Sequence, residues 1–224
     1  MKTIKRPFKT MLMALGLIGL AIAAVGCGTE ESGTNYEAAS SVNQTGRAGA
    51  ALVAQDLVGE WSSESCEAYP DGQGSTNYVT RTFSLTETKW DLNFTVFGDD
   101  ACSFPLFSSN VGGPFDLQTL SSNVDGATEG TFELEYNDWT AHAEDIVTAL
   151  EQSGCGTGEW SVGAAQDVTE TGCFGVAKPK SDCAAEYDVV SVHGDKLFFG
   201  ERITNMCAPE GRPAALNSYA VIRQ

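Results

Sequence analysis

Apolar and polar side chains alternate in several short stretches after residue 57, with the two-residue period of half-buried β-strands. In the clearest stretch, Trp90, Leu92 and Phe94 fall on one face while Asp91 and Asn93 fall on the other. The same period predicts strands at 79–85, 90–96, 132–136, 187–192, 196–199 and 216–223. Turn residues separate these stretches, as they do in antiparallel barrels and sandwiches.

A single segment, 141–152, has the period of a helix instead. Ile146, Val147 and Leu150 share one of its faces, and Gly154 follows as a helix stop. The whole pattern therefore predicts an all-β domain, mainly antiparallel, with one short helix. A chain of 224 residues is long enough for one such domain with a substantial core.

The first 26 residues have the features of an export signal. They contain four cations and no acid, and their apolar run at 11–26 is shorter than the roughly 20 residues of a membrane span. Ala24-Val25-Gly26-Cys27 resembles the bacterial lipobox, in which the cysteine is diacylated and the peptide before it is cut. The alternative is an ordinary secretory signal beside an incidental cysteine. We predict that Cys27 carries acyl chains such as palmitate and anchors an exported lipoprotein to a membrane.

Three segments follow from this pattern: a signal peptide at 1–26, an acylated flexible tether at 27–55 and one β-barrel domain at 56–224. The tether is rich in small and polar residues and has no sustained period. Gly28 stands where an inner-membrane retention signal has Asp, which favours the outer membrane. The sequence does not indicate which face of that membrane the domain occupies.

Six cysteines remain in the domain, and an even number in an exported protein indicates three disulfides. Many pairings are open to six cysteines. Pairing of neighbours along the chain is our prediction, with bridges Cys66–Cys102, Cys155–Cys173 and Cys183–Cys207. Each bridge is expected to contribute about 2–4 kcal/mol, largely by restricting the unfolded chain.

The acidic balance of the chain excludes one class of partner. The formal net charge is −17, and removal of the signal peptide leaves nine cations against 30 acids, a net charge of −21. Such a surface repels phosphate backbones, so we expect no nucleic-acid partner. We expect the domain to be a monomer whose contact with the membrane is made through Cys27.

No combination of reactive residues predicts catalysis. The six domain cysteines form no C-x-x-C pair, and His142 and His193 share no ligand spacing with them, so we expect no metal and no cofactor. Ser161 misses the G-x-S-x-G nucleophile motif by one residue. Acidic pairs such as Asp99-Asp100 are expected in so acidic a chain. We therefore predict that the protein is not an enzyme.

Large apolar side chains on single strand faces say more about the function than the candidate catalytic residues do. They either line a cavity or fill the interior, since small barrels are usually filled by their own side chains. Among them we single out Trp61, Phe83, Trp90 and Phe94 as candidate ligand-binding residues.

Several stretches of the domain resemble the adenomatosis polyposis coli down-regulated family of Wnt inhibitors. Leu57-Val58-Gly59-Glu60-Trp61 is also similar to the G-x-W start of lipocalins. The resemblance to the first family runs in order from about residue 57 to 224 and includes most of the cysteines. Its matching segments are Trp61, 64–67, Pro70, 80–83, Asp99, Cys102, Pro105, 127–129, the His142 helix, 172–174, 186–188, 197–202 and 211–213.

This resemblance implies a lipocalin-like antiparallel barrel with an apolar pocket for a fatty acyl chain, and it implies no catalytic residues. It also singles out Arg81 and Arg202, which are expected to stack on Trp61 or to meet a lipid headgroup at the mouth of the barrel. The animal relatives carry two such domains and a membrane span, so a Wnt partner is not implied here.

The sequence therefore leads to one principal hypothesis and two rivals. The principal hypothesis is a membrane-tethered module that binds a hydrophobic ligand, an acyl chain, inside the barrel. One rival is a surface-interaction or structural module with a filled barrel. The other is a hydrolase or lipid-modifying enzyme, which would require two or more ionisable groups to meet in one cleft.

Overall fold

A computed structural model describes residues 49–70, 75–174, 176–202 and 205–224. The predicted signal peptide, Cys27 and most of the predicted tether lie outside the described residues. Within the described part, the packing reaches back into the range predicted as tether, because Leu52 and Ala54 pack against the barrel core. No helix in the described part is long and apolar enough to cross a membrane.

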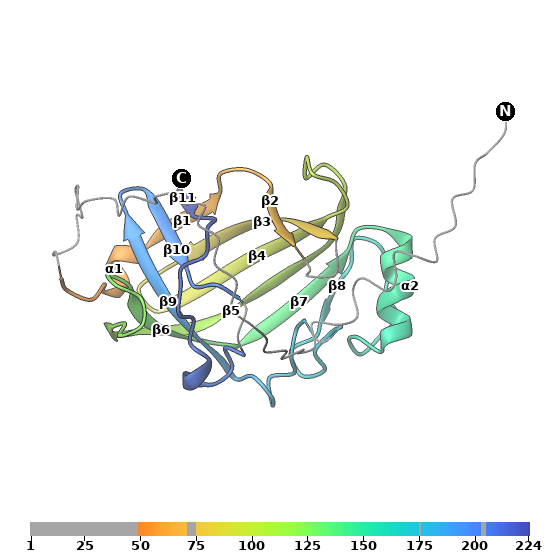
Figure 1. The fold of residues 1–224 in the computed structure, drawn as a ribbon. Coiled ribbons are helices and arrows are strands. Elements are labelled where there is room, and N and C mark those ends of the chain that lie inside the picture. Colours follow the sequence, from red (N-terminus) through yellow and green to blue (C-terminus); the bar gives the residue numbers. More distant parts are fainter. Residues whose placement is uncertain (1–48, 71–74, 175, 203–204) are drawn as a thin grey trace, which may run out of the picture.

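Eight described strands close into an antiparallel barrel (Figure 1). Each strand pairs with the next around the ring, and the last pairs with the first. In ring order they are β1 (Gly59–Ser63), β3 (Thr76–Leu85), β4 (Lys89–Phe97), β5 (Pro105–Leu120), β6 (Thr128–Glu133), β9 (Ala185–His193), β10 (Lys196–Phe199) and β11 (Val221–Arg223). The prediction of a mainly antiparallel barrel is confirmed.

Three further strands extend the sheet beyond the ring. β2 (Glu67–Pro70) pairs with the first part of β3, β7 (Tyr136–Ala141) with the first part of β5, and β8 (Ala165–Asp167) with β7. The 16-residue β5 makes this arrangement possible, because its first half pairs with β7 and its second half with β6. The barrel is thus closed at one end, and its sheet is splayed at the other.

The helices mark these two ends. α1 (Ala54–Leu57) lies at the closed end and α2 (Glu144–Ser153) at the open end (Figure 1). α2 confirms the predicted helix: Glu144 and Asp145 stand in its first turn, and Gly154 ends it in the left-handed conformation at φ 70°. Residue 141 belongs to β7 instead, because Ala141 pairs with Phe107. A 3₁₀ turn, η2 (Pro209–Gly211), lies in the connection from β10 to β11.

Two apolar cores fill the molecule, one at each end. The closed-end core lies inside the barrel and contains Leu57, Trp61, Phe83, Leu85, Trp90, Leu92, Phe115, Phe132, Val190, Leu197, Phe199 and Val221. The open-end core packs the splayed sheet against α2 and contains Val79, Val96, Phe107, Trp139, Ala141, Ile146, Val147, Leu150, Cys155, Trp160, Val168 and Cys173.

Two predicted strands were wrong in their extent. The stretch 132–136 forms parts of two strands, β6 and β7, because the chain turns between them and the backbone N–H of Glu135 bonds to the Gly112 oxygen. The last strand is Val221–Arg223 alone, and Leu216 makes only an isolated bridge to Gly200. The predicted strands around 79–85 and 90–96, and the hairpin across Gly194, are confirmed.

The strand β5 was not predicted, because Gly112, Gly113 and Pro114 interrupt its period. Glycine is required at these two positions because the backbones of other strands lie very close to them. A Cβ on Gly112 would lie 2.5 Å from the Trp90 oxygen, and one on Gly113 would lie 2.3 Å from the Glu133 oxygen. Any other residue would therefore force the strands apart where β5 passes from one partner to the other.

The three predicted disulfides are confirmed. Cys66–Cys102 joins the β1–β2 connection to the β4–β5 loop, and Cys155–Cys173 joins the end of α2 to the β8–β9 connection. Cys183–Cys207 joins the β8–β9 connection to the segment between β10 and β11. The bridges therefore hold connections, while the closed-end core contains no cysteine.

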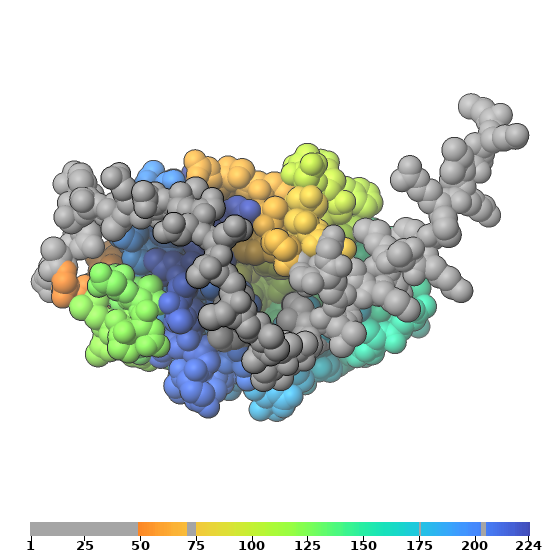
Figure 2. Space-filling model, in the orientation of Figure 1, coloured from red at the N-terminus to blue at the C-terminus, as the bar shows by residue number. Residues whose placement is uncertain are grey.

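The described segment 205–220, here called the crossover, runs over the outside of β6 and β9 and occupies the dark-blue face in Figure 2. Arg212 fixes it, since Nη1 donates to the backbone oxygens of Gly130 and Asp188, both at 2.6 Å. The Arg212 guanidinium also lies 3.3 Å from Glu129. Because these acceptors lie on β6 and β9, Arg212 joins both strands to the crossover.

Asp188 lies behind this contact and is 2% exposed. Its Oδ1 accepts hydrogen bonds from the backbone N–H groups of Val189 at 2.7 Å and Gly200 at 2.9 Å. Burial raises the pKa of Asp188 to about 6, although the nearby Arg202 charge and these bonds act in the opposite direction. The folded protein therefore binds this proton more tightly than the unfolded chain does.

Asp188→Asn is expected to change how stability depends on pH. A carboxyl whose pKa is raised on folding makes the folded state less stable as the pH rises from about 4 to about 6. At about 1.4 kcal/mol per pH unit, ionisation of Asp188 costs about 3 kcal/mol at pH 7. Urea unfolding of both proteins between pH 4 and 7 measures this, and the wild type should lose that much stability relative to Asp188→Asn. Parallel curves for the two proteins would contradict the assignment.

Candidate functional site

Three of the aromatic residues predicted to bind a ligand lie in the closed-end core. Trp61, Phe83 and Trp90 are at most 6% exposed. The Phe83 ring stacks on Phe199 at 4.5 Å, and the Trp90 ring meets Phe132 edge to face at 5.7 Å. Phe83 and Trp90 are thus packed against other rings of the same core, as the filled-barrel alternative expects.

The cation over the Trp61 ring is Arg223, with its guanidinium carbon 4.1 Å from the ring centre. We expected Arg81 or Arg202 to stack on Trp61 or to meet a lipid headgroup. The stacking alternative was wrong, because both arginines pair with carboxylates elsewhere. Arg223 comes from β11, which pairs with β1 so that Arg223 stands directly opposite Trp61. Trp61 itself donates to the Leu57 oxygen at 2.8 Å, which fixes α1 against the closed end of the barrel.

Arg81 belongs to a buried ion pair. Its Nε lies 3.1 and 3.0 Å from the two carboxylate oxygens of Glu67, and its Nη2 donates to the Tyr219 backbone oxygen at 2.9 Å. Ser63 and Tyr69 each donate a hydrogen bond of 2.6 Å to the same carboxylate. This pairing ties β2, β3 and the end of the crossover together, and it leaves Arg81 occupied within the protein.

Arg202 also pairs with a carboxylate, but near the surface. Both of its terminal nitrogens lie 2.7 Å from Oε2 of Glu186, and its side chain is 52% exposed. Burial alone would raise the pKa of Glu186, but the charge and hydrogen bonds of Arg202 hold it below its usual value. Arg202 therefore presents a partly solvated guanidinium beside the β9 strand, already matched by one anion.

Phe94 is the predicted ligand residue that connects the two cores. It lies on β4, is partly buried and packs against both the closed-end core and the open-end core. The candidate residues are therefore not brought together at one place. Three lie at the closed end, Phe94 lies between the ends, and the two arginines belong to separate ion pairs.

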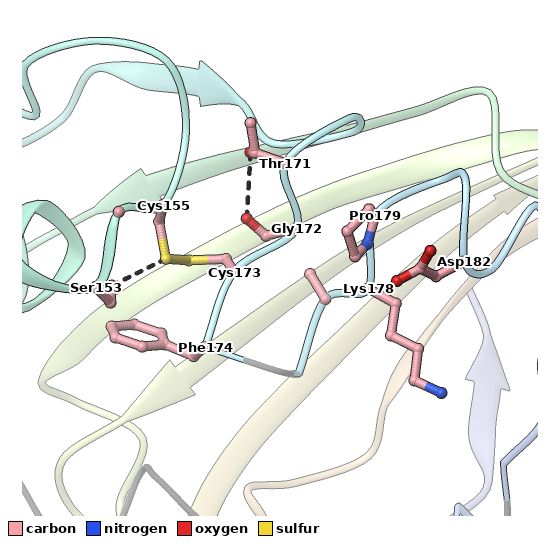
Figure 3. Close-up of a pocket in the computed structure, with 11 residues that line it drawn as sticks. Ser153, Cys155, Thr171, Gly172, Cys173, Phe174, Lys178, Pro179 and Asp182 are labelled. Carbon is pink, nitrogen blue, oxygen red and sulfur yellow. Dashed lines mark hydrogen bonds between the residues drawn. A yellow bond between two sulfur atoms is a disulfide. The ribbon is translucent and has the colours of Figure 1, made fainter.

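A pocket that the sequence did not predict lies at the open end. It has a volume of about 580 Å³ and is lined by Ser153, Gly154, Cys155, Thr171, Gly172, Cys173, Phe174, Ala177, Lys178, Pro179 and Asp182. Figure 3 shows the Phe174 ring beside the Cys155–Cys173 disulfide, whereas the Lys178 side chain extends away from it. The lining combines an apolar floor with a charged rim.

The floor of the pocket is continuous with the open-end core. Cys155 and Cys173 are members of that core, and Phe174 and Ala177 pack against it. A tight turn shapes this floor, because a Cβ on Gly172 would lie 2.6 Å from the Ala177 oxygen and its φ is 65°. Cys173 and Ala177 are bonded to each other through their backbones at 2.8 and 3.0 Å.

The rim of the pocket approaches the Arg202 pair. Lys178 donates to the Asn205 side chain at 2.7 Å, and its charge helps to keep the pKa of Glu186 low. Two cations therefore act on the same carboxylate, Lys178 from the pocket rim and Arg202 from the segment that follows β10. An anionic group bound at the rim would be attracted by both of them.

The two histidines bond to different serines in the described structure. His142 Nε2 lies 2.9 Å from Ser108 Oγ, and His193 Nε2 lies 2.9 Å from Ser191 Oγ. His142 stands between β7 and α2, whereas His193 ends β9. Among the described residues there is no group of three or more His, Cys, Asp or Glu side chains that could hold a metal ion.

Arg81→Met is expected to destabilise the fold strongly, because it leaves the Glu67 charge buried without a partner. A loss of about 3–5 kcal/mol in the free energy of unfolding is expected, and adding Glu67→Met should recover most of it. Urea denaturation followed by tryptophan fluorescence measures both values. Lys89→Met is the matched control, since its ion pair with Glu135 at 2.8 Å is exposed and its loss should leave stability almost unchanged. Equal losses in the two single variants would contradict a structural role for the buried pair.

Comparison with known families agrees with this architecture. The family model described as "Adenomatosis polyposis coli down-regulated 1" matches residues 36–190. The match spans more than half of the 224-residue chain and runs from before α1 to within β9. It includes all the strands of the splayed sheet and the residues of the open-end pocket. The chain therefore belongs to the adenomatosis polyposis coli down-regulated 1 family.

Proposed function

We propose that this protein is an exported, membrane-anchored lipoprotein whose barrel domain binds a hydrophobic ligand, an acyl chain, at its open end. Family membership and the barrel fold support a binding role of this kind. The protein acts in this proposal as a monomeric, non-enzymatic module without metal or cofactor. Its contact with the membrane is made by acyl chains on Cys27, a residue outside the described structure.

The observation that carries the proposal is the pocket beside the Cys155–Cys173 disulfide. Its volume of about 580 Å³ is within the range of small-molecule sites. Its apolar floor extends into the open-end core, so that a chain lying on Phe174 and Ala177 would remove apolar surface from water on both partners. The stacked rings of the closed-end core lead us to place the ligand at the open end instead.

The charges at the pocket suit a ligand with a polar head. Lys178 and Asp182 line the rim, and Arg202 lies nearby beside Glu186. In a domain with so large an excess of acids, these cations are the groups that would attract an acidic headgroup. An apolar chain would thus contact apolar side chains on the floor, and an acidic head would lie near cations at the rim.

A second function, protein interaction through a filled barrel, is favoured by one observation. The closed-end aromatic rings pack on one another, and two large apolar side chains, Phe104 and Val176, are 57% and 53% exposed. Exposed apolar groups of this kind contribute to contacts between proteins when they are part of a larger patch. The ligand test below separates the two functions.

Ala177→Trp is expected to block the pocket. An indole placed on the floor would occupy the volume that the acyl chain needs, and the affinity for a fluorescent fatty acid should fall by about tenfold or more. Fluorescence titration measures it, with Val162→Trp as a control because Val162 is exposed and outside the pocket lining. Mass spectrometry of lipid extracted from the purified protein supplies an independent measurement. Failure of the wild type to bind any fatty acid, with no lipid in the extract, would support the interaction module.

Cys27→Ser is expected to release the protein from the membrane. Acyl chains contribute about 0.8 kcal/mol for each buried CH₂, so their loss removes the anchor while leaving the domain unchanged. Membrane fractionation and intact-mass measurement should show a shift to the soluble fraction and loss of the acyl mass. A Cys27→Ser protein that stays in the membrane fraction would argue against this anchor.

A further inference from the structure

Trp139 is the residue from which the inference starts. It lies on β7 in the open-end core and is 2% exposed. Its ring stacks on Phe107 at 4.6 Å and meets Phe174, which lines the pocket, at 6.2 Å. Trp139 is therefore in contact with the pocket floor without being part of its lining.

The indole N–H of Trp139 differs from those of the other tryptophans. Trp61, Trp90 and Trp160 each donate to a backbone oxygen, at 2.8, 3.0 and 2.9 Å. Within the described residues, Trp139 Nε1 is the buried side-chain nitrogen or oxygen that has no hydrogen-bond partner. A buried donor without an acceptor is unfavourable, because folding has removed its water without replacing it.

The neighbouring polar side chains on this face do not supply the acceptor. Ser109 donates to the Asn137 side-chain oxygen at 2.8 Å, and the Asn137 backbone N–H donates to Thr169 at 2.8 Å. The polar groups of these three residues are thus hydrogen-bonded to one another, and the rings on either side of Trp139 have no oxygen that could accept a hydrogen bond. An acceptor for the Trp139 N–H would therefore come from outside this set of side chains.

Phe174, between Trp139 and the pocket, has an unusual backbone. Its φ is 52°, in the left-handed region that bulky residues rarely adopt. Strained backbone of this kind is concentrated at binding sites, where the surrounding structure holds a side chain in place. Here it holds an aromatic ring beside the disulfide, with its centre 6.2 Å from that of the Trp139 ring. Contact between a ligand in the pocket and the indole N–H would require this ring to move.

We propose that Trp139 is a specificity residue of the pocket and that its Nε1–H donates to the carbonyl oxygen of the bound acyl group. This inference rests on the proposed function and extends it to the chemistry of the ligand. A neutral donor among apolar rings matches one acceptor oxygen at the end of an apolar chain, and an alkane has none. A free acid and an ester both carry this carbonyl, and the test distinguishes them.

The test uses three probes of equal chain length: laurate, methyl laurate and dodecane. They are added to the full chain carrying Cys27→Ser, in which every described residue is unchanged, after ¹⁵N labelling of tryptophan. The Trp139 indole proton is expected to move to lower field with laurate and methyl laurate but not with dodecane. The indole signals of Trp61 and Trp90, which already donate, are expected to stay in place.

Trp139→Phe provides a second readout. Loss of the donor should weaken methyl laurate binding by about fivefold to tenfold and leave dodecane binding within about twofold. Trp160→Phe is the matched control, since Trp160 lies in the same core but donates to the Cys155 oxygen. It should not alter the ratio of ester to alkane affinity.

Stronger binding of laurate than of its ester would identify the free acid as ligand, with Lys178 as counter-charge, and the reverse order would identify an ester.

Failure of this inference is distinguishable from failure of the proposed function. Binding of all three probes with no movement of the Trp139 signal, and with unchanged affinities in Trp139→Phe, would overturn the role of Trp139 while leaving the acyl site in place. Absence of binding by every probe would overturn both.

Discussion

The whole architecture depends on how one long strand is shared between two partners. β5 pairs with β7 along its first half and with β6 along its second half, and the change of partner falls at Gly112 and Gly113. The backbone atoms of Trp90 and Glu133 come so close there that a side chain has no room. If either glycine were replaced, the ring could not close at one end while remaining splayed at the other. Two cores with different properties follow from this single constraint.

The two ends differ in how they use their buried groups. At the closed end, aromatic rings stack on one another and Trp61 is held by Leu57 and Arg223. Between the ends, the pairing of Arg81 with Glu67 fixes β2 to β3 at the cost of removing two charges from water. At the open end, the Trp139 N–H has no hydrogen-bond partner among the described residues and Phe174 has a left-handed backbone. In the function proposed above, the rigid core and the ligand site thus belong to separate parts of one sheet.

The sequence predicted those features that depend on local pattern. The strands around Phe83 and Trp90, the hairpin at Gly194, the helix before Gly154 and the pairing of neighbouring cysteines are all encoded within short segments. β5 was missed because its glycines have the appearance of a turn, although they are required by close contact with distant strands. The pocket was missed for a related reason. Its walls come from 153–155 and 171–182, which are joined by a disulfide and have no common period.

The charged residues were the hardest to assign from the sequence. The sequence alone does not distinguish Arg81, Arg202 and Arg223 as partners for Trp61. The register of the strands determines which of them lies over its ring. Arg212 was not singled out either, although it joins the crossover to β6 and β9. Partners this distant in sequence follow from the folded topology, and a local pattern contains no information about them.

The position of the disulfides links the pocket to the oxidation state of the protein. Cys155 and Cys173 are part of the open-end core, whereas the closed-end core contains no cysteine. Reduction would therefore loosen the pocket wall while the rings inside the barrel kept their packing. If the open-end pocket holds the ligand as proposed above, binding would depend on oxidation of Cys155 and Cys173, whereas formation of the barrel would not.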